Sequence, residues 1–230
     1  MIYLGIDTSN SPLAIALIQD QTVLMEETVN LKINHSLTAM PAIEELMAKA
    51  GIAPDQLTHI AVAEGPGSYT GVRIGLTIAK TLAWSLKIPL HMVSSLKVLA
   101  ANGQFFDGLV CPIMDARRGT VFCGLYEGKS LEPVLDDRHS DLKKFLAEVK
   151  SLNKPVLFTG ADLSIHENVI REEMGDAACF STIQNRLPRG SNVILLAQQS
   201  EAADVHHAVP EYRRITEAEA NYNKAKEGSA

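Results

Sequence analysis

The sequence is poor in cysteine and carries no surplus of positive charge. Its 230 residues include three cysteines, none of them in a Cys-x-x-Cys pair, which argues against a zinc ribbon or a dithiol redox centre. We therefore expect reduced thiols in a cytoplasmic protein. Asp and Glu number 27 against 21 Lys and Arg, for a formal net charge of -6. A protein that binds nucleic acid alone usually has the opposite balance, so work on RNA would need a partner that supplies positive surface.

Long hydrophobic runs and hydrolase motifs are also missing. The most apolar stretch, residues 74–90, is interrupted by Lys80 and Lys87. A membrane span needs about 20 apolar residues, so we expect none and no membrane partner. The seven histidines form neither His-x-x-x-His nor His-Glu-x-x-His, and no Gly-x-Ser-x-Gly is present. These absences disfavour a helix-borne zinc site and a serine hydrolase. We predict no metal ligands and no compact set of catalytic residues.

What is present is an order of strands and helices that occurs twice. The first half predicts strands at 2–6, 12–18 and 22–30, a helix from an N-cap at Ser36 to Gly51, a strand at 60–63 and a helix at 72–86. A strand at 89–93 and a short helix ending at Ala101 follow. The second half repeats the first pattern at 110–114, 120–126, 131–135, 141–150, 155–158 and 164–174, and adds a helix from a cap at Ser191 to Ala203. We therefore predict an α/β fold duplicated into two lobes, residues 1–104 and 105–230, with a frayed tail after about residue 216.

The strongest local motif is a glycine-rich turn between a predicted strand and helix, Gly65-Pro66-Gly67-Ser68-Tyr69-Thr70-Gly71-Val72-Arg73. Glycines allow a tight turn, and the N-terminus of the helix that follows offers unpaired N–H groups to an anion. Two interpretations stay open from spacing alone: an anion site, or a tight connection that binds nothing. We expect this turn and the ends of the first strand of each half to line a cleft between the two lobes. The candidate residues of this cleft are Asp7, Thr8, Ser9, Gly65, Pro66, Gly67, Ser68, Thr70, Gly71, Arg73 and Asp115.

The helix after this turn carries a small residue at every fourth position. Such a stripe lets another backbone approach closely, and its Gly75 costs about 1 kcal/mol relative to alanine, so some contact should compensate. The preceding helix has two methionines, which suit adaptable contacts. We interpret the two helices as a partner surface, with packing on their own sheet as the alternative. The residues assigned to the surface are His35, Ser36, Met40, Ile43, Met47, Gly71, Gly75, Ala79 and Ala83.

Together these motifs resemble those of the bacterial TsaB (YeaZ) family. The resemblance rests on Gly5-Ile6-Asp7-Thr8-Ser9, the glycine-rich turn extended to Gly75, Asp115-Ala116-Arg117 and Pro210-Glu211-Tyr212-Arg213-Arg214, in this order. It implies a two-lobe fold of the actin, sugar-kinase and heat-shock ATPase type, which is ribonuclease H-like. It also implies a part in making N6-threonylcarbamoyladenosine on tRNAs that read codons beginning with A.

The resemblance further implies that the chain is not itself the enzyme. In the family's pathway TsaD carries the metal and transfers the threonylcarbamoyl group, and TsaB is its required partner beside the ATPase TsaE. The N-terminal helices would bind TsaD or, in its absence, a second copy of the chain, and tRNA would be reached only through the complex. Weaker candidates for contacts with TsaD, TsaE or RNA are Arg117, Arg118, Arg213 and Arg214.

The nucleotide site expected of such a fold is degraded in this sequence. Kinases of the fold usually have a glycine two residues after the first-strand aspartate, where this chain has Ser9, and Asp115 is followed by Ala116 and Arg117. We therefore predict no intrinsic cofactor and, at most, a nucleotide at the interface with TsaD. Two alternatives stay open: an autonomous ATPase or kinase of the same fold, and a metal-dependent peptidase.

Overall fold

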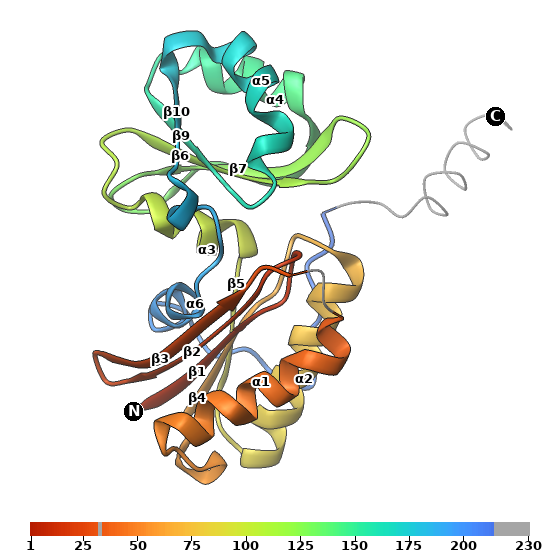
Figure 1. Ribbon diagram of the computed structural model, residues 1–230, viewed down its shortest axis with the longest axis vertical. Helices are drawn as coiled ribbons and strands as arrows, with labels where there is room; N and C mark the ends of the chain where they lie inside the picture. Colours follow the sequence, from red (N-terminus) through yellow and green to blue (C-terminus); the bar gives the residue numbers. More distant parts are fainter. Residues whose placement is uncertain (32–33, 214–230) are drawn as a thin grey trace, which may run out of the picture.

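The strands of the first half form one mixed sheet. The computed structural model describes residues 1–31 and 34–213, and the first sheet has the strand order β3-β2-β1-β4-β5 (Figure 1). Strands β1, β2 and β3 pair antiparallel, and β4 and β5 extend the sheet in parallel. Their bounds are Ile2–Asp7, Leu13–Gln19, Thr22–Val29, His59–Ala63 and Leu90–Val93.

The second sheet repeats this topology. Its order is β10-β9-β6-β7-β8, in which β6, β7 and β8 are antiparallel and β9 lies parallel to β6. Strand β6 therefore corresponds to β1 and β9 to β4, which confirms the predicted duplicated α/β fold. The bounds of β6 to β10 are Leu109–Asp115, Thr120–Glu127, Pro133–Asp141, Val156–Thr159 and Ala178–Phe180.

Six α-helices are described, and the two sheets separate three hydrophobic cores. Helices α1 (His35–Ala50) and α2 (Tyr69–Leu86) lie side by side on the outer face of the first sheet. Helices α4 (Leu142–Ser151) and α5 (Leu163–Met174) cover the outer face of the second sheet. Helices α3 (Ser95–Ala100) and α6 (Gly190–Ala197) pack between the two sheets. In the described part of the chain, no helix is both long and apolar enough to cross a membrane.

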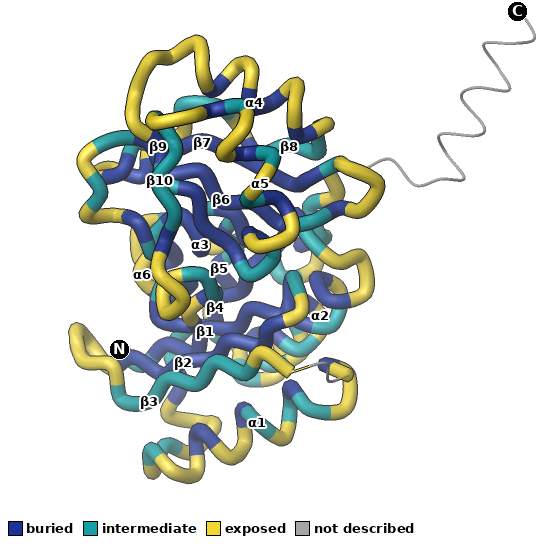
Figure 2. Tube along the Cα trace, turned by 45° about the horizontal axis from the view of Figure 1, so that its top comes forward, coloured by how far each residue is buried: buried dark blue, intermediate teal, exposed yellow. Residues whose placement is uncertain are grey.

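The end of the described chain returns to the first lobe. Helix α6 contacts β1 and β2, and the amide of Ala203 donates to the carbonyl of Leu90 at 2.8 Å. The C-terminal segment, residues 201–213, then runs along α2, where the Lys80 ammonium donates to the carbonyl of Ala208 at 2.6 Å. Residues from 190 onward therefore pack against the sheet of the first lobe. Figure 2 shows the central strands of both lobes buried, the edge strands β3 and β10 partly exposed, and the outer helices exposed on one side.

Several predicted boundaries are wrong, each for a local reason. Helix α1 is capped by Asn34, whose side chain accepts from the amide and the hydroxyl of Ser36 at 3.1 and 2.8 Å, so Ser36 is not the cap. Ser191 is not a cap either, because its amide and hydroxyl both donate to Glu26, and α6 ends at Ala197 instead of Ala203. The short strand β10 was not predicted, and the tail after residue 216 lies outside the described residues.

Candidate functional site

A cleft of about 1170 Å³ opens between the lobes, where the carboxyl ends of β1 and β6 meet. Ligands of α/β proteins generally bind at this end of a sheet. Its walls come from the turn after β1, the N-termini of α1 and α2, the turn between β6 and β7, and the C-terminal segment. The lining residues are Asn10, Ser11, Leu31, Asn34, His35, residues 67–72, Ile74, Met114, Asp115, Ala116, Arg117, Arg118, Phe122, Asp162, Glu211, Tyr212 and Arg213.

Asp7, the aspartate at the end of β1, does not line this cleft. Its side chain is completely buried, and its Oδ1 accepts from the Ser9 amide at 2.8 Å and from the Ser9 hydroxyl at 2.7 Å. Its Oδ2 has no hydrogen-bond partner among the described residues. Burial raises the pKa of Asp7, and the two bonds from Ser9 offset this only in part. The carboxylate is therefore held inward, away from any ligand in the cleft.

The glycine-rich turn lies directly on the backbone of residues 7–9. The Thr8 hydroxyl donates to the carbonyl of Gly71 at 2.7 Å, and the Ser68 amide donates to the carbonyl of Ser9 at 2.7 Å. A Cβ at Gly67 would lie 2.1 Å from the Ser9 carbonyl oxygen, and one at Gly71 2.2 Å from that of Thr8. Close contact between two backbones of the same chain thus accounts for both glycines. Binding of an anion by this turn stays a prediction.

Only some of the predicted cleft residues line the cleft. Gly67, Ser68, Thr70, Gly71 and Asp115 line the cleft. Ser68 is also the N-cap of α2, and its hydroxyl accepts from the Gly71 amide at 3.3 Å. The lining among the described residues does not include Asp7, Thr8, Ser9, Gly65, Pro66 or Arg73. The first five of these are buried.

In the second lobe, the strand-end aspartate has a partner that sequence reasoning missed. The Oδ1 of Asp115 lies 3.0 Å from Nε2 of the buried His166 on α5. The Asp115 amide donates to Oδ2 of Asp162 at 3.1 Å, and the Asn10 amide group donates to the same oxygen at 2.9 Å. Asn10 follows β1, so this carboxylate joins the strand ends of the two lobes. Each acid at this corner is engaged within the chain.

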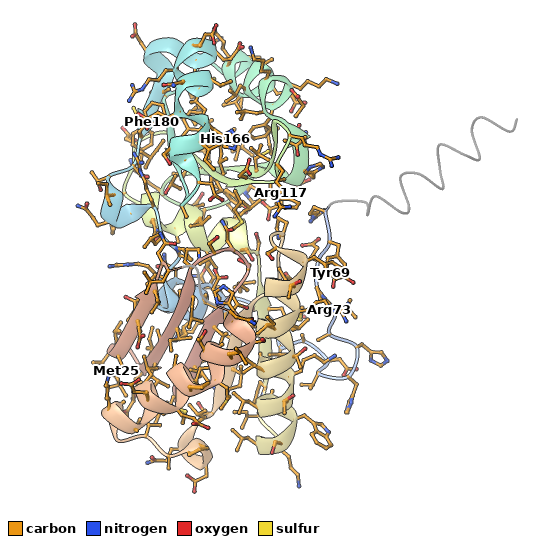
Figure 3. The ribbon with its side chains drawn as sticks, turned by 45° about the vertical axis from the view of Figure 1, so that its right-hand side comes forward. Met25, Tyr69, Arg73, Arg117, His166 and Phe180 are labelled. Carbon is orange, nitrogen blue, oxygen red and sulfur yellow. The ribbon has the colours of Figure 1, made fainter. Side chains whose placement is uncertain are left out.

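Aromatic and basic side chains gather at the mouth of the cleft. The rings of Tyr69 and Tyr212 stack with centroids 5.0 Å apart and planes at 24°. The Arg73 guanidinium lies 5.2 Å from the centroid of the Tyr69 ring and donates to the Tyr69 hydroxyl at 2.9 Å. Figure 3 shows Arg117 on the second lobe, across the cleft from Tyr69 and Arg73. Arg118 also lines the cleft, as does Arg213, which pairs with Glu211 at 2.5 Å. Arg214 lies outside the described residues.

The sequence of this chain is similar to proteins of tRNA threonylcarbamoyladenosine synthesis. A sequence model of TsaD, tRNA N6-adenosine threonylcarbamoyltransferase, matches residues 23–225. Over 224 residues the chain is 50% identical to the tRNA threonylcarbamoyladenosine biosynthesis protein TsaB of Bacillus subtilis (strain 168), covering 96% of this chain and 98% of that protein. The chain belongs to the TsaB family.

Solved structures agree with the fold implied by the TsaB resemblance. YeaZ from Pseudomonas aeruginosa matches with a TM-score of 0.74 at 24% sequence identity, over 92% of this chain and 99% of that chain. The ROK hexokinase from Thermus thermophilus matches with a TM-score of 0.52 at 11% identity, over 86% of this chain and 99% of that chain. The predicted fold, shared with sugar kinases, is therefore confirmed.

The partner surface predicted for this TsaB chain needs correction. Six of the residues assigned to it are buried between α1, α2 and the first sheet, and a Cβ at Gly75 would lie 2.4 Å from Oγ1 of Thr8. The stripe of small residues therefore lets α2 approach β1 of its own chain. His35 is buried as well, so only Ser36 and part of Met40 reach the surface. The six corrected residues are Ile43, Met47, Gly71, Gly75, Ala79 and Ala83.

The exposed apolar side chains of α1 and α2 are different ones. Leu37, in the first turn of α1, is 72% exposed. Met40 on α1 and Ile78 on α2 are partly exposed at the rim of the core beneath these helices, and Ile74 on α2 is partly exposed in the cleft lining. We call these four residues the α1–α2 face. The helical spacing of apolar residues in the sequence indicates that α1 and α2 have apolar faces, but it does not show which of these side chains are exposed to solvent.

Proposed function

We propose that the chain is a non-catalytic subunit required by a TsaD enzyme to form N6-threonylcarbamoyladenosine in tRNAs that read codons beginning with A. Membership in the TsaB family and the match to the TsaD sequence model support this assignment. The observation that carries the non-catalytic part is the burial of Asp7. An acid that must act on a bound nucleotide or metal has to face the cleft, whereas the Asp7 side chain is fully buried, accepts two hydrogen bonds from Ser9 and does not line the cleft.

Neither alternative function has comparable support. The second strand-end acid, Asp115, is paired with His166, so an ATPase or kinase would lack a free carboxylate at either strand end. A metal-dependent peptidase needs a group of ligands, and within residues 1–31 and 34–213 no three His, Cys, Asp or Glu side chains are arranged to hold a metal ion. A supporting subunit requires neither feature.

We further propose that TsaD docks on the α1–α2 face. Leu37 leaves a large apolar side chain exposed in the first turn of α1, on a helix that packs against α2, and an exposed apolar patch is typical of an interaction site. In the absence of TsaD, a second copy of the chain would bind the same face. TsaE, a nucleotide at the TsaD interface and tRNA would join only in the assembled complex, in the cytoplasm.

Replacing Asp7 with asparagine tests the non-catalytic assignment. In Asp7→Asn, the side-chain oxygen can still accept from Ser9, and the buried charge is lost. The pKa of Asp7 in the folded chain is raised above 3.8, so the protonated carboxyl group favours the folded state. This contribution to stability is complete below pH 3.8 and is lost as the pH rises through the folded pKa. Asp7→Asn should therefore be more stable than the native chain at neutral pH by about 1 kcal/mol or more, which is about 2–4 °C in Tm. Below pH 3.8 the difference should disappear.

In reconstituted tRNA modification with TsaD, TsaE and ATP, Asp7→Asn should retain the native rate within about twofold, because no step uses this carboxylate. Asp176→Asn, which removes an exposed carboxyl group, controls for the change in net charge and should leave Tm unchanged. A folded Asp7→Asn chain that supports no modification would contradict the non-catalytic assignment and favour an ATPase or kinase.

A further inference from the structure

We propose that the mouth of the cleft binds an unpaired stretch of RNA, with bases stacking at Tyr69 and Tyr212 and phosphates contacting Arg117 and Arg118. The inference rests on the proposed function, because it names a direct RNA contact of this chain inside the tRNA-modifying complex. It is confined to the cleft mouth, beside the α1–α2 face on the same helix α2.

The aromatic half of the site consists of two tyrosines that remain accessible. Tyr69 is 54% exposed and Tyr212 is 46% exposed, although their rings stack on each other. The Arg73 guanidinium lies against Tyr69, so the cluster joins flat aromatic surface to a cation. Unpaired bases stack on such side chains at about 1–3 kcal/mol per base, whereas bases inside a duplex are already stacked. The cluster therefore fits unpaired RNA better than a helix.

The basic half of the site is the turn between β6 and β7. Arg117, Arg118 and Gly119 have φ angles of 67°, 55° and 75°, so two consecutive arginines adopt the left-handed conformation. This conformation costs about 1–2 kcal/mol per residue with a side chain, and asparagine or glycine tolerates it better. Strain of this kind is typical of functional sites. Both arginines are exposed and line the cleft, so a phosphate that enters the cleft can contact them.

The acids that line the cleft all make contacts within the chain. Glu211 pairs with Arg213, Asp115 contacts His166, and Asp162 accepts from Asn10. The cleft volume of about 1170 Å³ exceeds the roughly 300–1,000 Å³ of pockets that hold a small molecule. The net charge of -6 keeps the isolated chain from binding RNA strongly, which is consistent with a contact made only inside a complex.

The test measures RNA binding by the assembled complex of this chain with TsaD. The probes are a fluorescent tRNA that the complex modifies and an unstructured RNA on the order of 10 nucleotides, near the site size of single-strand binders. The variant Arg117→Asn/Arg118→Asn removes both cations and suits the left-handed turn. Tyr212→Leu keeps an apolar side chain and removes the flat ring. The matched control is Lys129→Asn/Lys143→Asn, which removes two exposed cations of the second lobe.

We expect Arg117→Asn/Arg118→Asn to weaken binding of both probes at least about tenfold, and to reduce the slope of log Kd against log salt by about 1.4, or about 0.7 per phosphate contact. Its Tm should be equal to or higher than that of the native chain. Tyr212→Leu should weaken binding of the unstructured RNA without changing the salt slope. The control should bind as the native complex does.

Unchanged binding by both test variants would overturn the inference, as would equal weakening by the control. Competition by an RNA duplex as strong as that by the unstructured RNA would overturn the stacking contact. If the chain fails to associate with TsaD at all, the proposed function fails, and this is seen before any RNA is added.

Discussion

Leu37→Asp is expected to weaken the association of the chain with TsaD at least about 100-fold, and to lower tRNA modification accordingly at limiting concentrations. Leu37 is the most exposed apolar residue of the α1–α2 face, at 72%. Burying it in an interface is favourable, whereas burying an unpaired aspartate is costly, and truncation of a central apolar contact alone often costs 2 kcal/mol or more. Isothermal titration of TsaD with each variant measures the change in Kd directly.

The fold should tolerate this substitution, because an acidic residue in the first turn of a helix interacts favourably with the helix dipole. The matched control is Ile165→Asp, which introduces the same charge in place of an exposed apolar side chain (63%) on α5 of the other lobe. The control should bind TsaD as the native chain does. Native affinity of Leu37→Asp, in a chain with native circular dichroism, would rule out the α1–α2 face as the docking surface.

Gly71→Ala is expected to destabilise the chain by about 3 kcal/mol or more. Its Cβ would lie 2.2 Å from the carbonyl oxygen of Thr8, a distance that requires the turn to move away from residues 7–9. That movement would also stretch the bond from the Thr8 hydroxyl to the Gly71 carbonyl. Overfilling a close contact commonly costs 1–3 kcal/mol, and loss of a buried hydrogen bond adds to it. Urea unfolding at neutral pH measures the difference.

The control for this experiment is Gly51→Ala at the end of α1. Gly51 has a φ of 67°, and nothing lies within 4 Å of its Cβ position, so the same substitution there adds backbone strain without a clash. Its cost should be about 1 kcal/mol. Equal destabilisation by the two variants would mean that the contact between the glycine-rich turn and residues 7–9 contributes little.

The order of elements could be predicted because it is written in hydrophobic runs bounded by turn residues. Hydrophobic runs do not mark the second half of β8, residues 136–141, because polar side chains follow one another there. Asp137 is only 9% exposed there because the hydroxyls of Ser94 and Tyr126 donate to its carboxylate. Ser94 is distant in sequence, and hydrophobic periodicity cannot detect a polar strand that is stabilised by such long-range bonds.

The candidate site was predicted less completely, for a related reason. The spacing of Gly71 and Gly75 indicates that another part of a chain comes close, but it does not say that this part is Thr8, directly after β1 of the same chain. Likewise, Asp7 at a strand end is typical of a ligand site, and only the structure reveals that Ser9 covers it. His166 lies at an ordinary position of an amphipathic helix, and Tyr212 comes from the far end of the chain. No local pattern links either residue to the cleft.

The most direct test of the central claim is tRNA modification in vitro with each component left out in turn. The reaction contains this chain, TsaD, TsaE, ATP, tRNA and the threonylcarbamoyl donor, and the product is measured by mass spectrometry of the digested tRNA. The account predicts full activity with all components, background activity without this chain, and none when this chain replaces TsaD. Undiminished modification in the absence of this chain would contradict its assignment as a required subunit.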